Sequence, residues 1–154
     1  MDGHETWLSE CAKMGYEPEA RLYAEGTRTS QDAANQLGCD VAHIAKSIVF
    51  AGRDGAVVVI TSGANRVERK RKLKRLLGYK PSMTDAEYIL ENTGYAPGGV
   101  PPFGHLRPCA VLMDEDLMQY DLVWGAGGTA QTVFPITPED LFSLSGATVA
   151  DVKQ

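Results

Sequence analysis

The chain has 154 residues, of which 44% are hydrophobic and 23% are charged. This length and composition are typical of one globular domain and exclude a disordered chain. No apolar run approaches the ~20 residues of a membrane-spanning helix, and the first residues lack the basic and apolar regions of a secretory signal. The formal net charge of −5 argues against binding of nucleic acid, but this value is an average over the whole chain. Residues 66–75 hold seven of the 15 basic residues and one acid, so this segment carries +6 and the remaining chain −11.

The cysteines and histidines favour neither a disulfide framework nor a metal site. The three cysteines are odd in number, far apart and form no C-x-x-C pair, which indicates free thiols in a reducing, cytoplasmic setting. The histidines lack ligand spacing, and tetrahedral zinc needs three or four converging ligands, so we expect no metal. These residues are Cys11, Cys39, Cys109, His4, His43 and His105.

The first elements follow from apolar spacing and capping residues. Helical spacing predicts a helix over residues 6–14, closed by Gly15. Residues 21–24 are expected to form a short strand. Thr29, with Asp32 three residues later, predicts the N-cap of a second helix that ends at Gly38.

A β-hairpin is the strongest local signal in the chain. Residues 44–51 and 56–61 are apolar, β-branched runs, and Asp54-Gly55 between them is the expected turn. The basic segment that follows is expected to be a helix ending at Gly78. Its inner side is predicted to carry Val67, Leu73, Leu76 and Leu77.

The second half of the chain mixes short helices and strands. A capping box at Thr84–Glu87 predicts a helix over 85–92, and Thr137 followed by Pro138 predicts a helix to about Leu144. Because there is no regular βαβ alternation, the sequence predicts one α+β domain over residues 1–154. We expect a mixed, mostly antiparallel sheet or partial barrel flanked by helices. The further strands are expected over 109–113, 122–124, 132–136 and 148–152.

Lys46 is unusual because it shares one face of its strand with Ile44, Ile48 and Phe50. A lysine on an apolar face either reaches solvent at the end of the strand or meets an anion. The first arrangement is the commoner one. The second would place a cation at the mouth of a cleft, facing a phosphate or a carboxylate.

Two glycine-rich loops can each be interpreted in two ways. Residues 94–105 contain four Gly and three Pro, which combines a rigid backbone with accessible N–H groups. Such a loop binds an oxyanion or a carbonyl, or it is a long structural turn. It is neither a P-loop nor a dinucleotide fingerprint. The loop 125–129 has the same alternatives, with a hairpin turn as the commoner one.

The basic segment 66–75 is either a solvated helix face or a contact for a phosphodiester backbone. Such a contact would position a nucleic acid without reading its sequence. No nucleophile is evident, because Ser47, Ser62 and Ser82 lack a Gly-x-Ser-x-Gly elbow and an evident histidine partner. An enzyme of this sequence would therefore depend on positioning and electrostatics.

Five sequence blocks occur together in the order of one family. They are residues 44–50 (IAKSIVF), 62–67 (SGANRV), 93–95 (TGY), 98–104 (GGVPPFG) and 123–129 (VWGAGGT). Over about residues 29–151 the chain resembles the YbaK / prolyl-tRNA-synthetase-associated domain family, the stand-alone trans-editing aminoacyl-tRNA deacylases. The resemblance implies hydrolysis of the ester that joins a wrong, small amino acid to a tRNA, typically tRNA-Pro. It also implies assistance by the 2′-hydroxyl of the terminal ribose or by a water, no metal or other cofactor, and a transient association with an aminoacyl-tRNA synthetase.

The resemblance also implies roles for individual residues. Lys46 falls on the family's key lysine, expected to anchor the 3′-terminal adenosine. Gly98-x-x-x-Pro102 falls on a loop whose backbone, with Gly99, is expected to stabilise the oxyanion. The amino-acid pocket is expected from Tyr23, Ile48, Phe50, Phe103, Gly128 and Thr129, and the tRNA contacts from Asn65, Arg66, Arg69, Lys70 and Lys72. The subfamily stays open, because the chain departs from the family's common residues at His43, Glu68 and Gly125.

Two other functions stay open at this point. A non-catalytic module of the same fold would bind a tRNA end or an aminoacyl-adenylate-like ligand, or dock on a synthetase, through the same lysine and loop. A small-molecule esterase or amidase would act without tRNA and with little dependence on salt.

Overall fold

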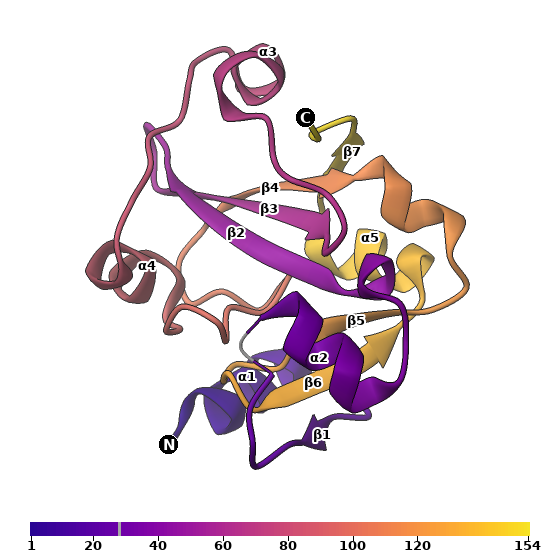
Figure 1. Cartoon of the computed structure of the whole chain (residues 1–154). Coiled ribbons are helices and arrows are strands. Elements are labelled where there is room, and N and C mark those ends of the chain that lie inside the picture. The colour runs from indigo at the N-terminus through magenta and orange to yellow at the C-terminus, as the bar shows by residue number, and fades with distance from the viewer. Residues whose placement is uncertain (28) are drawn as a thin grey trace.

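The structure is a computed structural model that describes residues 1–27 and 29–154. The N-terminus, α1 and β1 lie toward one end of the molecule, and α3 and the C-terminus lie toward the opposite end (Figure 1). Its helices and strands are, in chain order, α1 (Gly3–Lys13), β1 (Arg21–Leu22), α2 (Ser30–Leu37), β2 (Ala45–Ala51), β3 (Ala56–Ser62), α3 (Lys74–Leu77), α4 (Ala86–Thr93), β4 (Ala110–Asp114), β5 (Val123–Ala126), β6 (Thr132–Ile136), α5 (Pro138–Ser145) and β7 (Thr148–Ala150).

The strands form two sheets. One has the order β2-β3-β4-β7, with β2 and β3 antiparallel and the other two pairs parallel. The second is antiparallel, in the order β1-β6-β5. A single bridge between Ile44 and Trp124 links the edges of the two sheets. The predicted α+β class is confirmed, and the strands are divided between two open sheets that do not close into a barrel.

The predicted hairpin is confirmed, with Lys46 of β2 opposite Thr61 of β3. Every residue of β3 is buried, because β3 lies inside its sheet and both of its faces are covered. Val58 and Ile60 face the main core, whereas Val57 and Val59 face a second cluster beneath the basic segment. The hairpin therefore separates two layers of the molecule.

Capping residues explain where most helices begin. Thr29 and Thr137 accept hydrogen bonds from the amides of Asp32 and Asp140, as predicted. The predicted cap at Thr84 was wrong, because the side chain of Asp85 accepts from the amide of Tyr88 and begins α4. The start predicted for the first helix was also wrong: Asp2 caps α1 at Gly3, three residues earlier.

The basic segment folds as a π-helical turn, Arg69–Leu73, that continues into α3 and ends at Gly78. Glu68 begins this turn, because its carboxylate accepts hydrogen bonds from the amides of Arg71 and Lys72 at 2.8 Å. Leu73 is fully buried, but the expectation that Leu76 faces inward was wrong, since it is 37% exposed. Leu73 is thus the fully buried side chain through which this segment packs against the second cluster.

The main core packs aromatic rings between the two sheets. Trp7 of α1 is fully buried, with its ring centroid 4.5 Å from that of Phe134 and 5.8 Å from that of Phe103. Such tilted aromatic pairs add to the burial of apolar area. Within residues 1–27 and 29–154, no helix combines the length and apolar character needed to cross a bilayer.

Candidate functional site

The main cavity has a volume of about 530 Å³ and lies between β2, α2, β5 and the loop before residue 102. This volume falls within the ~300–1,000 Å³ typical of small-ligand sites. Most of its wall is apolar, with hydroxyl groups near the start of α2. The lining residues that matter below are Thr29, Lys46, Ile48, Gly98, Val100 and Trp124.

Lys46 lies at the mouth of this cavity and also lines a second cavity of about 530 Å³ on the other side of β2. Its side chain is exposed, and no hydrogen bond or ion pair engages its ammonium within residues 1–27 and 29–154. Lys46 is therefore a cation placed between two hollows, available to an anion in either one.

The loop Pro97–Gly104 is held by three side chains that donate hydrogen bonds to its carbonyl oxygens. Trp7 Nε1 donates to Phe103 O at 3.0 Å, and Tyr95 Oη donates to Gly104 O at 2.7 Å. His105 Nε2 lies 2.7 Å from Pro101 O, and because that carbonyl only accepts, Nε2 must carry a proton. Burial lowers the pKa of His105, which favours the neutral ring in this position. These contacts fix the loop from behind, on the side of the core.

The amides of this loop are not equivalent. The N–H of Gly99 donates to Ala96 O at 3.1 Å, so it already has a partner. Among the described residues, no acceptor engages the N–H groups of Gly98 and Val100, and both residues line the cavity. Gly98 has a φ of +85°, which glycine adopts without strain. The free donors beside the cavity are thus Gly98 and Val100, whereas the sequence singled out Gly98 and Gly99.

Gly99 has a packing role instead. A Cβ at this position would lie 2.6 Å from Thr129 Cα and 2.8 Å from its carbonyl carbon. The Gly-rich loop 125–129 therefore supports the loop that contains Gly98. Thr129 Oγ1 lies 2.8 Å from Thr132 Oγ1, and Gly128 packs against the backbone of Gly3 at the start of α1.

The structure brings only part of the predicted amino-acid pocket into the main cavity. Ile48 lines it, and Phe50 lines the second cavity. Phe103 is 2% exposed and packs in the aromatic core, while Gly128 and Thr129 form the support just described. Tyr23 pairs through its amide with Gln131 O at 2.8 Å and is not among the lining residues. Pro102 is buried beside Gly125.

Sequence reasoning missed several lining residues. Trp124, Ile89 and Val133 come from three different elements, and Thr29 was noticed only as a helix cap. Trp124 stands within the block VWGAGGT, directly before a glycine-rich loop. This position in the sequence was the one signal that could have indicated Trp124 as a lining residue. Arg21 covers its ring, with the guanidinium carbon 4.9 Å from the ring centroid.

The residues predicted to contact tRNA divide into two groups. Asn65, Arg66, Arg69 and Lys70 line the second cavity. Lys72 does not: its ammonium lies 2.7 Å from Asp151 Oδ2 and also donates to Lys153 O. Lys72 therefore ties the basic segment to the C-terminus.

A buried carboxylate shapes the loop that leads into the basic segment. Asp114, at the end of β4, is fully buried and accepts hydrogen bonds from the Ser62 amide at 3.1 Å and from Asn65 Nδ2 at 2.8 Å. Asn65 Nδ2 also donates to Asp116, and Lys153 pairs with that carboxylate at 2.6 Å. These partners hold the pKa of Asp116 below its ordinary value. The network explains the block SGAN as a structural turn that presents Arg66.

Among the described residues that line the main cavity, no side chain is prepared as a nucleophile. The hydroxyl groups of Ser30 and Ser47 are buried without a hydrogen-bond partner in the described part of the chain. Burial raises the pKa of the Cys11 thiol to about 12 and that of Cys109 to about 11, so neither forms a thiolate at neutral pH. Over the described ranges 1–27 and 29–154, no three His, Cys, Asp or Glu side chains converge on a metal position.

Comparison with known proteins agrees with this geometry. Residues 24–144 match the aminoacyl-tRNA editing domain family, which is more than half of the chain. The chain belongs to this family. The matched residues include Lys46, the loop Pro97–Gly104 and the second cavity's Arg66, and they leave α1 outside. The resemblance seen in the sequence is thereby confirmed, and the family points to removal of amino acids from aminoacyl-tRNA.

Individual relatives are similar over nearly their whole length. A solved structure described as "a putative trans-editing enzyme for prolyl tRNA synthetase" is 38% identical, with a TM-score of 0.93 over 100% of this chain and 98% of that one. YwhH of Bacillus subtilis, an uncharacterised protein, is 29% identical over 84% of this chain and 82% of its own. EbsC of Enterococcus faecalis, named "Putative Cys-tRNA(Pro)/Cys-tRNA(Cys) deacylase", is 24% identical over 94% and 89%.

Proposed function

We propose that this protein is a trans-editing hydrolase that removes a small, wrong amino acid from an aminoacyl-tRNA, with tRNA-Pro as its substrate. The observation that carries this proposal is that Lys46, which has no ionic partner in the described part of the chain, lines the same cavity as Gly98 and Val100, whose amides have no acceptor there. A cation suits the phosphate of a terminal nucleotide, and paired N–H donors suit an ester carbonyl. The family match and the relatives named above support the same substrate class.

The proposed reaction uses substrate and solvent as its reacting groups. Water, positioned by the 2′-hydroxyl of the terminal ribose, adds to the ester carbonyl carbon and forms a tetrahedral oxyanion. Gly98 and Val100 donate to this oxyanion from a loop that Trp7, Tyr95 and His105 hold in place. The bond from the carbonyl carbon to the ribose 3′-oxygen then breaks, and that oxygen takes the proton that the water gave up.

Positioning by this loop is the larger part of the proposed catalysis. Donors that are fixed before the reaction need no rearrangement when charge develops, and removing one oxyanion donor typically costs ~10²–10³ in rate. The buried, unpartnered hydroxyl of Ser47 and the raised thiol pKa values agree with a mechanism that has no covalent enzyme intermediate.

A deacylation panel tests the proposal. One tRNA-Pro is charged separately with Ala, Cys, Ser, Thr and 2-aminobutyrate, and the loss of the aminoacyl ester is followed over time. We expect turnover of at least one of these esters, and loss of a charge-assisted contact in Lys46→Ala should lower kcat/KM by about tenfold to a hundredfold. Lys13→Ala is the matched control, because Lys13 is exposed on α1 and, among the described residues, its ion pair is with Glu10.

A non-catalytic module of the same fold is the second candidate, favoured by the lack of a prepared nucleophile among the described residues of the cavity. It predicts binding of tRNA without turnover of any ester in the panel. Full activity of a folded Lys46→Ala protein would contradict both candidates, since each uses this lysine as the anchor.

A further inference from the structure

The second cavity lies next to the main one and shares Lys46 and Ile48 with it. It is bounded by β2, by Thr61 of β3, by the turn that leads into the basic segment, by Met83 and by the C-terminal Gln154. A substrate whose terminal nucleotide occupies the main cavity would have its preceding nucleotide within reach of this hollow, because Lys46 stands at the boundary of both.

The wall of the second cavity combines positive charge with apolar surface. Arg66 and Lys70 are exposed and, like Lys46, have no ion-pair partner within residues 1–27 and 29–154. Arg69 is directed by a hydrogen bond from Nη1 to Pro81 O at 2.9 Å. Glu68 is the one acidic side chain among the described lining residues, and its carboxylate accepts hydrogen bonds from the amides of Arg71 and Lys72. The cavity thus attracts an anion.

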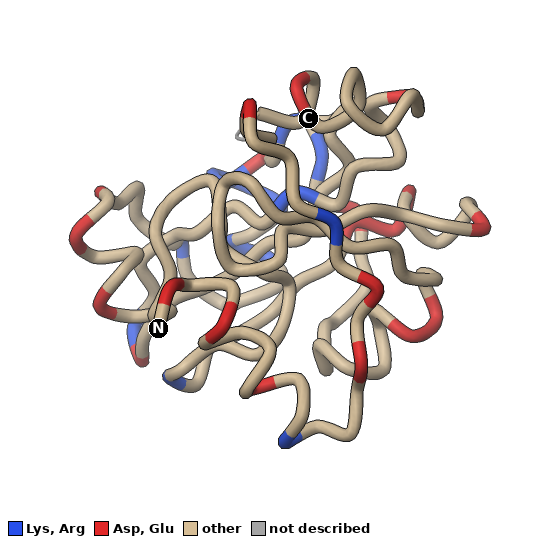
Figure 2. Tube along the Cα trace, turned by 90° about the horizontal axis from the view of Figure 1, so that it is seen from below, with Lys and Arg blue, Asp and Glu red and all other residues tan. Residues whose placement is uncertain are grey.

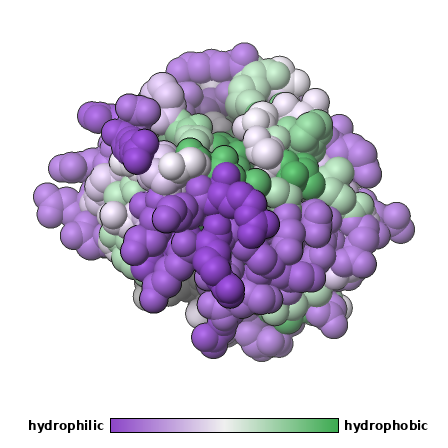
Figure 3. Space-filling view, turned by 90° about the horizontal axis from the view of Figure 1, so that it is seen from above, coloured by the Kyte–Doolittle hydropathy of each residue, from purple (hydrophilic) through white to green (hydrophobic). Residues whose placement is uncertain are grey.

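The apolar part of this wall comes from Ile48, Phe50, Val67 and Met83. Phe50 is 4% exposed and forms the floor, whereas Met83 is 69% exposed at the rim. A thioether on the surface is suited to contact an aromatic ring, such as a nucleobase. Seen from the side of α3, apolar side chains are gathered between hydrophilic ones (Figure 3).

We infer that the second cavity binds the nucleotide that precedes the acylated terminal nucleotide of the tRNA. Its base lies on the apolar floor and against Met83, and the phosphate that joins it to the terminal nucleotide lies between Lys46, Arg66 and Lys70. This inference rests on the proposed function, and it gives the basic turn a defined ligand in place of a diffuse contact with the tRNA backbone.

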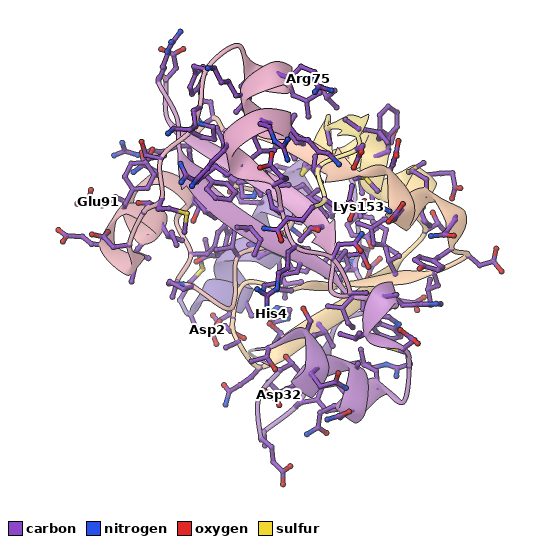
Figure 4. The ribbon with its side chains drawn as sticks, turned by 45° about the horizontal axis from the view of Figure 1, so that its top comes forward. Asp2, His4, Asp32, Arg75, Glu91 and Lys153 are labelled. Carbon is purple, nitrogen blue, oxygen red and sulfur yellow. The ribbon has the colours of Figure 1, made fainter. Side chains whose placement is uncertain are left out.

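The charge distribution supports this assignment over a general basic face. In the view of Figure 2, many Lys and Arg residues lie in the upper middle of the trace and a few lie at its lower edge, while Asp and Glu are spread around the periphery. Arg75 projects from α3 at one end of the molecule, and Asp32 lies at the opposite end (Figure 4). Arg75 lines neither of the two cavities, although it belongs to the same basic segment as Lys70. It is therefore a matched control.

The test compares three substrates that carry the amino acid best removed in the deacylation panel: the full tRNA, the ester of cytidylyl-adenosine, and the ester of adenosine 5′-monophosphate. Stacking of a base on an aromatic side chain is worth ~1–3 kcal/mol, so we expect kcat/KM for the dinucleotide ester to exceed that of the mononucleotide ester by about fivefold to 150-fold. Turnover of the dinucleotide ester with none of the mononucleotide ester would support the inference still more strongly.

Variants then locate the effect. Met83→Ala should bring the dinucleotide-to-mononucleotide ratio of kcat/KM toward one. The double variant Arg66→Ala/Lys70→Ala should lower kcat/KM for both small esters, because both carry the phosphate that these side chains contact, while Arg75→Ala keeps the wild-type values and the wild-type ratio. Melting curves identify any variant that fails to fold, and Met83→Ala, at an exposed position, keeps the test usable if the double variant does. Equal turnover of the two small esters by the wild type would overturn the inference. Absence of turnover on the full tRNA would overturn the proposed function itself.

Discussion

Replacing Gly99 by alanine tests whether the two glycine loops position the reaction. The added Cβ would lie 2.6 Å from Thr129 Cα, and its other near neighbours, at 2.8 and 2.9 Å, are also backbone atoms of Thr129. Backbone atoms cannot swing aside as the end of a side chain can. The loops must therefore separate by about 0.8 Å to restore the 3.4 Å of an ordinary contact.

The cost is expected in both stability and rate. Overpacking of this kind costs ~1–3 kcal/mol, which for a chain of this length lowers the melting temperature by about 2–12 °C. A displacement of ~1 Å at positioning groups can reduce a rate ~10²-fold, so we expect kcat/KM to fall by about tenfold to a hundredfold. Deacylation of the best substrate in the panel and thermal melting followed by circular dichroism measure the two effects.

Gly15→Ala separates loss of stability from loss of positioning. Gly15 has a φ of +73° with no neighbour of its Cβ within 4 Å, so alanine there is strained but displaces nothing. Its left-handed backbone should cost ~1–2 kcal/mol while kcat/KM stays at the wild-type value. Two results would contradict this reasoning: wild-type kcat/KM in Gly99→Ala, or a loss of kcat/KM that follows the loss of stability equally in both variants. Either result would mean that contact of the loop 125–129 with the loop containing Gly98 does not matter for the reaction.

Three further predictions concern residues outside the cavities. Tyr95→Phe leaves the Gly104 carbonyl without its hydrogen-bond donor, so the melting temperature and kcat/KM should both fall. Tyr88→Phe is the control, and equal melting temperatures and kcat/KM values in the two variants would show that the Tyr95 hydroxyl does not hold the loop in place. Asp116→Asn should lower the melting temperature at pH 7. Because the Lys153 ammonium lowers the folded-state pKa of Asp116, this stabilisation is present above the unfolded pKa of ~4 and is lost as the pH falls through the folded pKa. The difference between the two melting temperatures should therefore narrow as the pH falls below ~4, and a difference that did not narrow in acid would exclude this carboxylate as the cause. Lys72→Ala should lower the melting temperature but leave the salt dependence of tRNA affinity unchanged, and a flatter slope would show instead that Lys72 contacts phosphate.

Local signals in the sequence predicted much of the fold. The hairpin β2–β3 and the caps at Thr29 and Thr137 depend on residues close together in the chain, and all three are confirmed. The division into two sheets depends instead on the parallel pairs β3–β4 and β4–β7, which join segments separated by whole helices and loops. No local pattern records such pairs, so a single sheet or partial barrel was the natural expectation.

The candidate site shows the same limit. Lys46 and Gly98 could be selected from the sequence, because each stands within a block whose composition is unusual. The structure places both at one cavity. Phe103 belongs to the same glycine-rich block, yet it faces the core, where Trp7 from the other end of the chain covers it. Lys72 differs from Lys70 through its contacts with Asp151, which is 79 positions along the chain from Lys72, and with the carbonyl of Lys153. Distant partners thus decide which residues of a block remain available to a ligand.

Net charge misleads for this protein because its charges are segregated. Residues 46–80 contain ten of the 15 basic residues and two of the 20 acidic residues, so they carry +8 and the rest of the chain −13. At physiological salt, screening limits interactions between exposed charges to roughly 8 Å. A phosphate beside Lys46 is therefore expected to respond to Arg66 and Lys70, which line the same cavity, while acids elsewhere weaken the attraction of a polyanion to the faces that carry them. An acidic protein whose basic residues are gathered in one segment is in this way suited to hold the end of a nucleic acid without binding along its length.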